Sequence, residues 1–253
     1  MNLFSTDLSI LWPALIAGLL VVTSHVPLGQ QVLSRGIVFI DLAIAQVAAL
    51  GVIAADYAGW PATGFAVQVA ALLSALACAA VLTWTDRRWA QVQEAIIGVV
   101  FVVASSTAIL VLAKNPHGGE NLKDLLSGQI LWVNPLRLVF VALFYGVILA
   151  VWFGFRERLG RVGFYVLFGC AVTVSVQLIG LYLVFATLVV PALATFYSRS
   201  RRLVKGYCVG TLGYAAGLLA SVVTDLPSGP MIVCAIVAVG LLTAALTAPR
   251  TAT

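Results

Sequence analysis

Long apolar runs follow one another along most of this chain, and short breaks rich in glycine, proline or charged residues separate them. A helix needs roughly 20 apolar residues to cross the hydrocarbon core of a bilayer, whereas buried strands are only about 4–8 residues long. The pattern therefore predicts an all-α fold, a polytopic membrane helix bundle with about nine transmembrane helices (eight to nine). The predicted spans are Leu8–Val26, Gly36–Ala55, Pro61–Trp84, Ala95–Ala113, Leu136–Phe155, Val162–Ile179, Leu181–Tyr197, Val204–Thr224 and Met231–Thr247.

The boundaries between these spans rest on local breaks in the sequence. Pro27 with Gly29 ends the first span, because proline and glycine commonly interrupt helices. The stretch from Val162 to Tyr197 is too long for one span, so we place a break near Gly180. Since the apolar runs leave no room for a soluble domain, residues 1–253 are predicted to form a single transmembrane domain.

The composition agrees with a membrane protein. Of the 253 residues, 62% are hydrophobic and 9% are charged, and the mean hydropathy is +1.09. Soluble domains are about 45–50% apolar and about 25% charged. So many apolar side chains would form large exposed patches in water. The composition therefore excludes a cytosolic enzyme, a nucleic-acid-binding protein and a disordered regulator.

The positions of the basic residues predict the orientation of the chain. There are 14 Lys and Arg, and the net charge is +5. If the first helix starts outside, all of them except Lys114, Lys123 and Arg137 fall in connections on the cytoplasmic side. Lys and Arg are retained on that side during insertion, so we predict an N-terminus outside and a C-terminus inside. The positive charge is thus a topology signal and not a footprint for nucleic acid.

Asp41 is the only acidic residue deep inside a predicted span. A carboxylate at the bilayer centre costs about 2.5–3.5 kcal/mol, so such residues normally face a transport pathway or a partner. Two interpretations stay open: Asp41 lines a pathway, or it lies near the cytoplasmic end and pairs with Arg35. Gln46 is a second polar candidate, although hydrogen bonding between helices alone would explain it. It lies about 140° around the helix from Asp41, so the two cannot easily ligate one ion together.

Both histidines are candidate metal ligands. His25 ends the first span beside Pro27, and His117 lies one helical turn from Glu120 in the predicted outer loop. Histidine and carboxylate side chains bind zinc or manganese, but two ligands do not complete a site. The alternative is that His117 and Glu120 belong to a solvated polar loop and that His25 has no ligand role.

The sequence lacks the motifs of ATP hydrolysis and of intramembrane hydrolases. None of its three lysines follows a G-x-x-x-x-G loop, and neither H-E-x-x-H nor G-x-S-x-G occurs. These motifs carry phosphate binding, zinc-dependent hydrolysis and serine nucleophiles, respectively. We therefore expect this chain not to be an enzyme.

Four segments resemble motifs of metal-type (zinc/manganese) ABC importer permeases. Val176–Ala192 is similar to the V-G-x-L-L-x-x-x-L-x-x-P-A segment of that family, and Asp225–Pro230 to its D-x-P-x-G-P motif. Glu94–Gly98 resembles the E-x-A-I-G opening of a helix, and Leu125–Leu131 resembles the L-x-G-x-I-L turn. The four segments occur in the family's order and spacing and together extend over nearly the whole chain.

The resemblance implies the permease subunit of a bacterial inner-membrane importer, whose substrate is zinc, manganese or a similar divalent cation. Such permeases work as dimers, with two cytoplasmic ATP-binding cassette ATPase subunits and an extracytoplasmic metal-binding protein; the chain itself is expected to bind no cofactor. In that family the segment after the P-A motif forms the coupling helix on the ATPase. In this sequence the coupling residues would be Pro191, Ala192, Thr195, Phe196, Tyr197, Arg199 and Arg201.

The sequence departs from the family at the second helix. Family members carry G-D-A-L-x-H there, and the Asp and His contact the passing ion. Aligning on Gly51 places Leu42 and Gln46 at those two positions, and Asp41 is shifted by one residue, which is about 100° around a helix.

These observations leave a set of candidate residues and two rival functions. Asp41, Gln46 and His25 are the candidate pathway residues, while His117 and Glu120 are candidate contacts for metal or for the metal-binding protein. An ion-gradient-driven secondary transporter stays open as an alternative, although such carriers usually need more than one buried ionisable residue. A membrane scaffold without transport is the other alternative.

Overall fold

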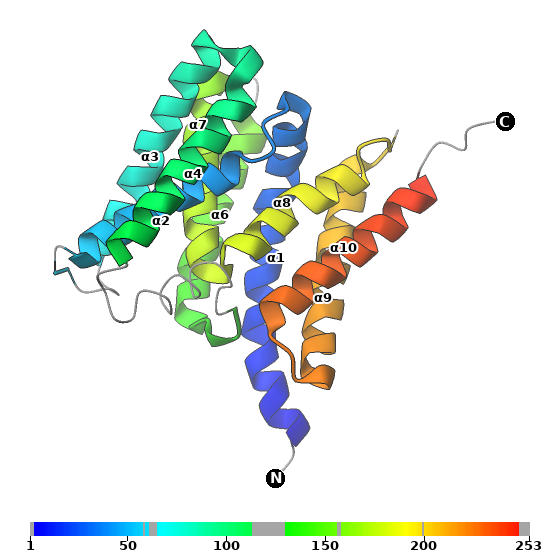
Figure 1. The fold of residues 1–253 in the computed structure, drawn as a ribbon. Coiled ribbons are helices and arrows are strands. Elements are labelled where there is room, and N and C mark those ends of the chain that lie inside the picture. The colour runs from blue at the N-terminus through cyan, green and yellow to red at the C-terminus, as the bar shows by residue number, and fades with distance from the viewer. Residues whose placement is uncertain are drawn as a thin grey trace. The chain divides into compact units, whose positions relative to one another are not determined.

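The structure is a computed structural model, and it describes residues 3–57, 59–60, 65–112, 130–155, 158–198 and 200–247. All regular secondary structure in these ranges is helical, which confirms the all-α prediction. The α-helices, labelled as in Figure 1, are α1 (Leu3–Arg35), α2 (Ile40–Tyr57), α3 (Phe65–Arg88), α4 (Gln93–Leu112), α6 (Pro135–Phe155), α7 (Gly160–Ile179), α8 (Leu181–Ala194), α9 (Arg202–Thr224) and α10 (Ser228–Thr247). Two short 3-10 helices are η1 (Ala90–Val92) and η2 (Ile130–Trp132).

Each of the predicted spans corresponds to one of these helices, and 8 of them are long and apolar enough to cross a membrane. The exception is α8, which has 14 residues. With a rise of about 1.5 Å per residue it is roughly 21 Å long, which is shorter than the ~30 Å hydrocarbon core. The predicted span Leu181–Tyr197 is therefore wrong at its end, because the helix stops at Ala194 and a turn follows. The orientation of the chain stays a prediction.

The predicted break near Gly180 is confirmed. α7 ends at Ile179 and α8 begins at Leu181, and Gly180 between them has φ 84° and ψ 161°. Glycine enters this backbone region without the steric cost that a Cβ would bring. The N–H of Val184 donates to the carbonyl of Gly180 at 3.1 Å. The same glycine therefore ends one helix and starts the hydrogen-bond ladder of the next.

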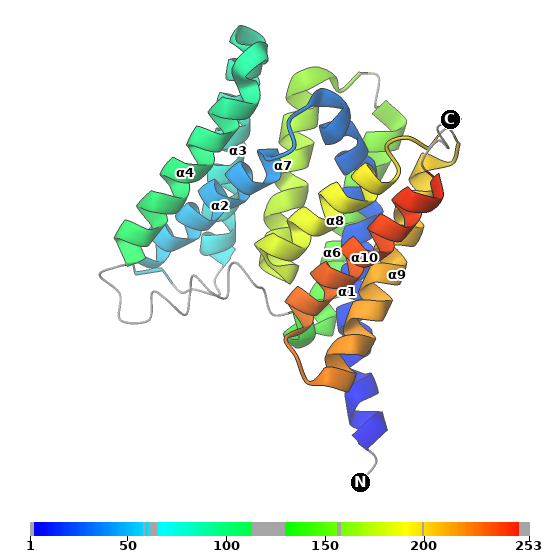
Figure 2. The same ribbon diagram turned by 45° about the vertical axis from the view of Figure 1, so that its right-hand side comes forward.

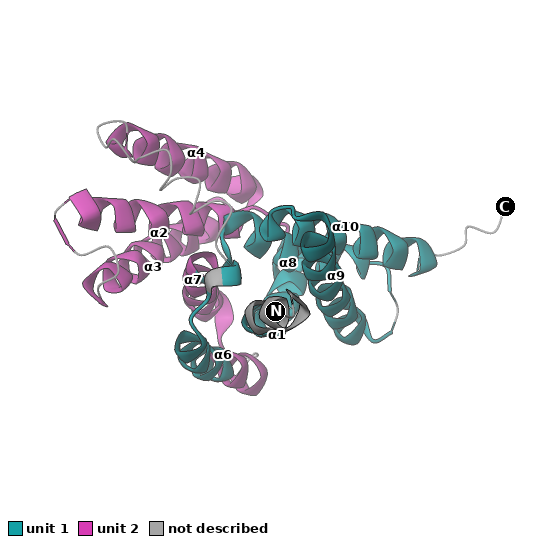
Figure 3. Cartoon of the chain, turned by 90° about the horizontal axis from the view of Figure 1, so that it is seen from below, with its two compact units in different colours: residues 1–35, 127–147, 178–253 teal, residues 36–126, 148–177 magenta. Residues whose placement is uncertain are grey.

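The chain divides into two compact units, drawn in different colours in Figure 3. Unit 1 consists of residues 1–35, 127–147 and 178–253, and unit 2 of residues 36–126 and 148–177. α6 contributes its first part to unit 1 and its second part to unit 2. That both units work together as one permease domain stays a prediction.

In unit 1, α1, α8, α9 and α10 pack against one another, and α9 and α10 lie side by side in Figures 1 and 2. Two glycines allow the close approach of α9 to α10. A Cβ on Gly213 would lie 2.7 Å from the Cα of Ile236, and a Cβ on Gly217 would lie 2.8 Å from the backbone nitrogen of Ile232. Glycines spaced four residues apart are typical of closely packed membrane helices. Here they serve packing within the chain.

In unit 2, α2 packs against both α3 and α4. One apolar cluster joins α2 to α4 through the buried side chains of Ile53, Ala108 and Leu112, with Leu50 and Val111 packed against it. A second, polar contact region lies at the other end of these helices, where α4 begins. That region contains the candidate functional residues described below.

The first helix is longer than the sequence predicts, because α1 continues through Pro27 to Arg35. The proline ring has no N–H to donate to the carbonyl four residues earlier, so it frees the Thr23 carbonyl from the helix ladder. Tyr207 on α9 supplies the missing donor: its hydroxyl donates to the Thr23 carbonyl at 3.1 Å. The prediction that Pro27 ends the first span is therefore wrong, because a hydrogen bond from a distant helix stabilises the interrupted ladder.

Large apolar side chains remain exposed on several helices. Phe65 on α3, Val223 on α9 and Leu246 on α10 expose 84%, 85% and 87% of their surface. Apolar faces of this kind are not stable in water as large patches. Together with the 8 helices of membrane-spanning length, they identify the chain as a multi-pass membrane protein.

Candidate functional site

Asp41 lies in the first turn of α2, so the prediction that it lies deep along a span is wrong in that respect. The preceding loop, from Gly36 to Phe39, takes up residues that the sequence assigned to the span. Asp41 is nevertheless 0% exposed. Neither of its carboxylate oxygens has a hydrogen-bond partner in the described structure. The backbone N–H groups of Asp41 and Leu42 lie nearby but do not reach hydrogen-bonding geometry.

Glu94 is a charged residue near Asp41. It sits in the first turn of α4 and interacts electrostatically with the Asp41 carboxylate. Its Oε1 accepts a hydrogen bond of 3.2 Å from the backbone N–H of Phe39, in the loop that leads into α2. Its Oε2 is buried and has no hydrogen-bond partner in the described structure. Asp41 and Glu94 are therefore near each other where α2 and α4 begin.

The other two candidate pathway residues, Gln46 and His25, are also buried. Gln46 is 6% exposed and lies five residues along α2 from Asp41, which turns it about 140° away. His25 belongs to unit 1, on α1, and is 0% exposed. Its Nδ1 lies 3.0 Å from the Ser24 hydroxyl and 3.2 Å from the Val21 carbonyl. Its Nε2 is buried and has no partner within the described ranges. The structure thus places Asp41 with Glu94, and not with Gln46.

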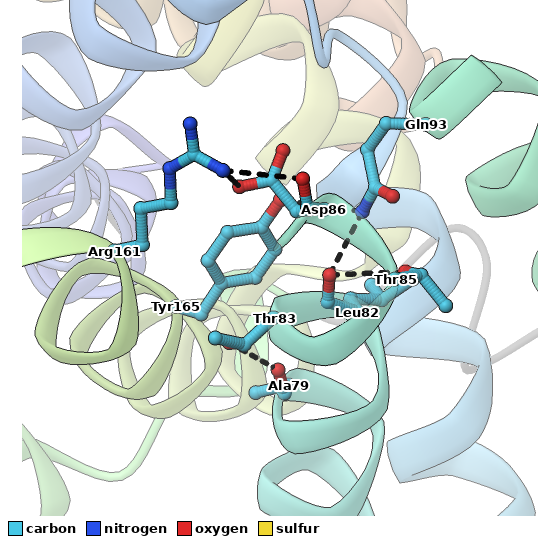
Figure 4. A network of polar contacts seen from close by, with 8 residues as sticks. All are labelled: Ala79, Leu82, Thr83, Thr85, Asp86, Gln93, Arg161 and Tyr165. Atoms are coloured by element: carbon cyan, nitrogen blue, oxygen red, sulfur yellow. Dashed lines mark hydrogen bonds and ion pairs between the residues drawn. The ribbon is translucent and has the colours of Figure 1, made fainter. Parts of the chain in front are cut away.

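The start of α4 is held in place by a polar network, shown in Figure 4. The Gln93 side chain donates from Nε2 to the Leu82 carbonyl at 3.0 Å and to the Tyr165 hydroxyl at 3.3 Å. Arg161 on α7 donates to the Asp86 carbonyl at 3.1 Å and forms an ion pair with the Asp86 carboxylate at 3.4 Å. These contacts join α3, α4 and α7 within unit 2. They fix the backbone from which the neighbouring Glu94 extends.

The candidate coupling segment begins inside α8, with Pro191 and Ala192 buried. Thr195 ends the helix, and its hydroxyl donates to the Pro191 carbonyl at 2.8 Å. The chain then turns over Thr195–Tyr197, so the described part of the segment is a turn between α8 and α9. Within the described residues, a coupling helix over the whole segment, as the family resemblance implies, is wrong at Thr195–Tyr197, because Pro191–Ala194 belong to α8 and the chain then turns.

Aromatic and basic side chains of this turn are exposed. Phe196 and Tyr197 are 42% and 72% exposed, and their rings meet edge to face with centroids 5.1 Å apart. The guanidinium of Arg202 lies 5.6 Å from the centre of the Phe196 ring. Arg201 has φ 53° in the left-handed region and precedes α9. The turn thus presents a defined surface of rings and positive charge, of a kind enriched at protein interfaces.

Three predicted residues fall outside the described part of the chain. They are His117, Glu120 and Arg199. Conversely, the sequence did not predict Glu94 as a site residue, although it begins the Glu94–Gly98 motif. Glu94 could have been found because it is an acidic residue directly before an apolar run. The predicted topology also places the start of that run on the same side of the membrane as the start of the span that contains Asp41.

Comparison with known proteins gives one family and two related structures. The sequence matches the ABC 3 transport family over residues 7–164 and 153–247. PsaBC from Streptococcus pneumoniae, solved in complex with a Fab, is similar with a TM-score of 0.74 and 18% identity, over 92% of this chain and 90% of that chain. A transporter assigned to the metal-chelate type of ABC transporters, in an inward-facing conformation, is similar with a TM-score of 0.62 and 16% identity, over 94% of this chain and 82% of that chain. At these identities the two likenesses establish the fold.

Proposed function

Because this chain belongs to the ABC 3 transport family, we propose that it carries a divalent metal cation, zinc or manganese, into the cytoplasm across a bacterial inner membrane. As a member of that family it is a membrane permease subunit, and ATP is hydrolysed by a separate subunit. Membership of this family decides against the two rival functions, a secondary transporter and a membrane scaffold without transport. The family match, which extends over nearly the whole chain, is the observation that carries the proposal.

The working assembly that we propose contains two copies of this chain, two ATPase subunits and an extracytoplasmic metal-binding protein. ATP binding by the ATPase subunits would shift the permease between outward-open and inward-open states. A metal chelate is the second candidate cargo, because one of the two similar structures is assigned to the metal-chelate type.

Uptake in cells tests the cargo and the direction together. We expect cells that lack this chain to accumulate less radioactive zinc or manganese than cells that have it. Cells that lack only the partner ATPase should show the same deficit. Greater accumulation in the deletion strain would indicate export and would contradict the proposal. Uptake of only a chelated metal would select the second candidate.

For the pathway, we propose that Asp41, Gln46 and His25 line the route of the ion. Asp41→Asn should then lower uptake with no loss of protein from the membrane, since it removes a charge and keeps the side-chain size. Asp56→Asn is the matched control, because Asp56 is an exposed residue near the far end of the same helix. Equal uptake by both variants would remove Asp41 from the pathway.

For the outer side, we propose that His117 and Glu120 contact the metal or the metal-binding protein. Replacing both by alanine should weaken capture of that protein by the purified permease. Binding of the metal-binding protein at wild-type strength would assign the two residues to a solvated loop.

For the coupling segment, we propose that Phe196, Tyr197 and Arg201 contact the ATPase, with Pro191, Ala192 and Thr195 shaping the turn and Arg199 adding charge. Arg201→Glu should reduce co-purification of the ATPase, because it reverses a charge on the exposed turn. Arg88→Glu is the control, since Arg88 is an exposed arginine at the end of α3. An undiminished ATPase yield with Arg201→Glu would refute the assignment.

A further inference from the structure

Two acidic side chains of unit 2 approach each other from the beginnings of two helices. Asp41 is in the first turn of α2 and Glu94 in the first turn of α4, and α2 and α4 pack against each other. The Glu94 carboxylate binds the backbone N–H of Phe39, two residues before Asp41, which brings the two acidic residues to the same end of the helix pair. Both are far from the predicted outer loop in sequence, and neither belongs to the coupling turn.

Three of the four carboxylate oxygens in this pair are buried and have no hydrogen-bond donor among the residues that the structure describes. These are Oδ1 and Oδ2 of Asp41 and Oε2 of Glu94. Oε1 of Glu94 accepts a hydrogen bond from the N–H of Phe39 at 3.2 Å, and the N–H of Val38 also lies near this carboxylate. Asp41 as a whole is 0% exposed. Buried polar atoms nearly always have partners, so three unpaired acceptors at one place need an explanation.

The helix ends do not supply that explanation. The positive end of a helix macrodipole favours a carboxylate in the first turn, by about 0.3–1 kcal/mol at exposed sites. It acts on each helix separately, however, and it does not reduce the repulsion between two neighbouring carboxylates. A positive ion between them would both remove the repulsion and occupy the unpaired oxygens.

We propose that Asp41 and Glu94 together form a binding site for a hard divalent cation within unit 2. Carboxylate oxygens are the ligands that manganese, magnesium and calcium prefer, while nitrogen and sulfur ligands characterise most zinc sites. The site should accordingly bind manganese, magnesium or calcium in preference to zinc. This inference rests on the proposed function in that Asp41 is a pathway residue there, and it adds Glu94 as the second ligand.

Binding of Mn²⁺ alone to the purified full-length permease in lipid nanodiscs tests the site. We expect one saturable class of Mn²⁺ in the wild-type protein by equilibrium dialysis and electron paramagnetic resonance, and competition by excess Mg²⁺ or Ca²⁺. Asp41→Asn and Glu94→Gln should each weaken this binding by at least about 10-fold, since even losing an outer contact to a metal ligand costs that much. Asp56→Asn, on the exposed end of α2, should leave it unchanged.

Glu94→Gln keeps an acceptor for the Phe39 N–H, so it removes the charge and not the local hydrogen bond. A loss of binding in this variant therefore reports the ligand role and not a disrupted fold. Thermal unfolding gives a second readout: Mn²⁺ should raise the unfolding temperature of the wild-type protein and of Asp56→Asn, but not of the two site variants. If Asp41→Asn is recovered in low yield, the comparison of Glu94→Gln with Asp56→Asn still tests the site.

The outcomes separate this inference from the proposed function. Mn²⁺ binding that persists in both site variants, while deletion of the chain still abolishes metal uptake, overturns the site and leaves the proposed function standing. If Mn²⁺ binding is lost in both variants while deletion of the chain leaves metal uptake unchanged, the site stands and the proposed function is overturned. Wild-type protein whose stability responds to pH but not to Mn²⁺ would assign the pair to a shared proton and overturn the cation site.

Discussion

Replacing Tyr207 by phenylalanine removes one oxygen atom and leaves the Thr23 carbonyl without its donor. The carbonyl was released from the helix ladder by Pro27 and accepts the Tyr207 hydroxyl at 3.1 Å. Hydrogen bonds between membrane helices contribute about 0.6 kcal/mol on average and about 1.7 kcal/mol at most, and a buried acceptor left unpaired costs about 1–3 kcal/mol. Because this bond is only partly buried, we expect Tyr207→Phe to lower the free energy of unfolding by about 1 kcal/mol.

A second substitution shows whether the proline is the cause. In Pro27→Ala the new N–H of residue 27 can donate to the Thr23 carbonyl within α1, so that carbonyl no longer depends on α9. Tyr207→Phe in the Pro27→Ala background should then cost close to nothing. The double-mutant cycle should give a coupling energy of about 1 kcal/mol, which measures the interaction without assuming that the single variants are otherwise silent.

The free energies can be measured by unfolding the purified permease in mixed micelles with increasing denaturing detergent, followed by tryptophan fluorescence. Tyr182→Phe is the control for loss of a tyrosine hydroxyl, because Tyr182 is 55% exposed. It should shift the unfolding midpoint little. If Tyr207→Phe costs the same with Pro27 as with Ala at that position, the two effects are additive and the account of how α1 passes through its proline is refuted.

Four further substitutions test packing and polar contacts. Gly217→Ala should destabilise unit 1 by about 1–3 kcal/mol, because the new methyl group meets the α10 backbone. Gly98→Ala, whose methyl group meets no described atom, should stabilise the protein by up to about 1 kcal/mol through helix propensity. Equal shifts of the thermal unfolding temperature in the two variants would contradict this. Gln93→Met should cost about 1 kcal/mol in denaturation because it removes the donor to the Leu82 carbonyl, and an unchanged midpoint would show that the network is dispensable. Arg161→Gln should cost less than about 1 kcal/mol, as the arginine is 52% exposed, and its effect should shrink in high salt.

The number, type and order of the helices could be predicted from the sequence because their cause is local. Each helix is long and apolar in its own right, and the break at Gly180 follows from a run too long for one span. The end of α8 was less predictable, because the apolar run continues through Phe196 and Tyr197 although the helix stops at Ala194. The passage of α1 through Pro27 was not predictable, since it depends on Tyr207, 184 residues away from its acceptor.

The candidate site was predictable only in part, for the same reason. The sequence marks Asp41 as unusual because a charge within an apolar run needs a cause. It does not show that Glu94 is the neighbour, because the two are brought together by the packing of α2 on α4. It also places Asp41 too deep, because residues 36–39 form a loop although Ile37, Val38 and Phe39 are as apolar as the helix that follows.

The division of the chain into two units has a consequence for biogenesis. α1 precedes unit 2 in the sequence, but α8 and α9, against which it packs in unit 1, follow unit 2. All residues of unit 2 have been made once the ribosome passes Gln177. Until α9 has been made, the Thr23 carbonyl of α1 lacks the hydrogen bond that it receives from Tyr207 in the folded chain. α1 can therefore pack against α8 and α9 only after the whole of unit 2 has been synthesised.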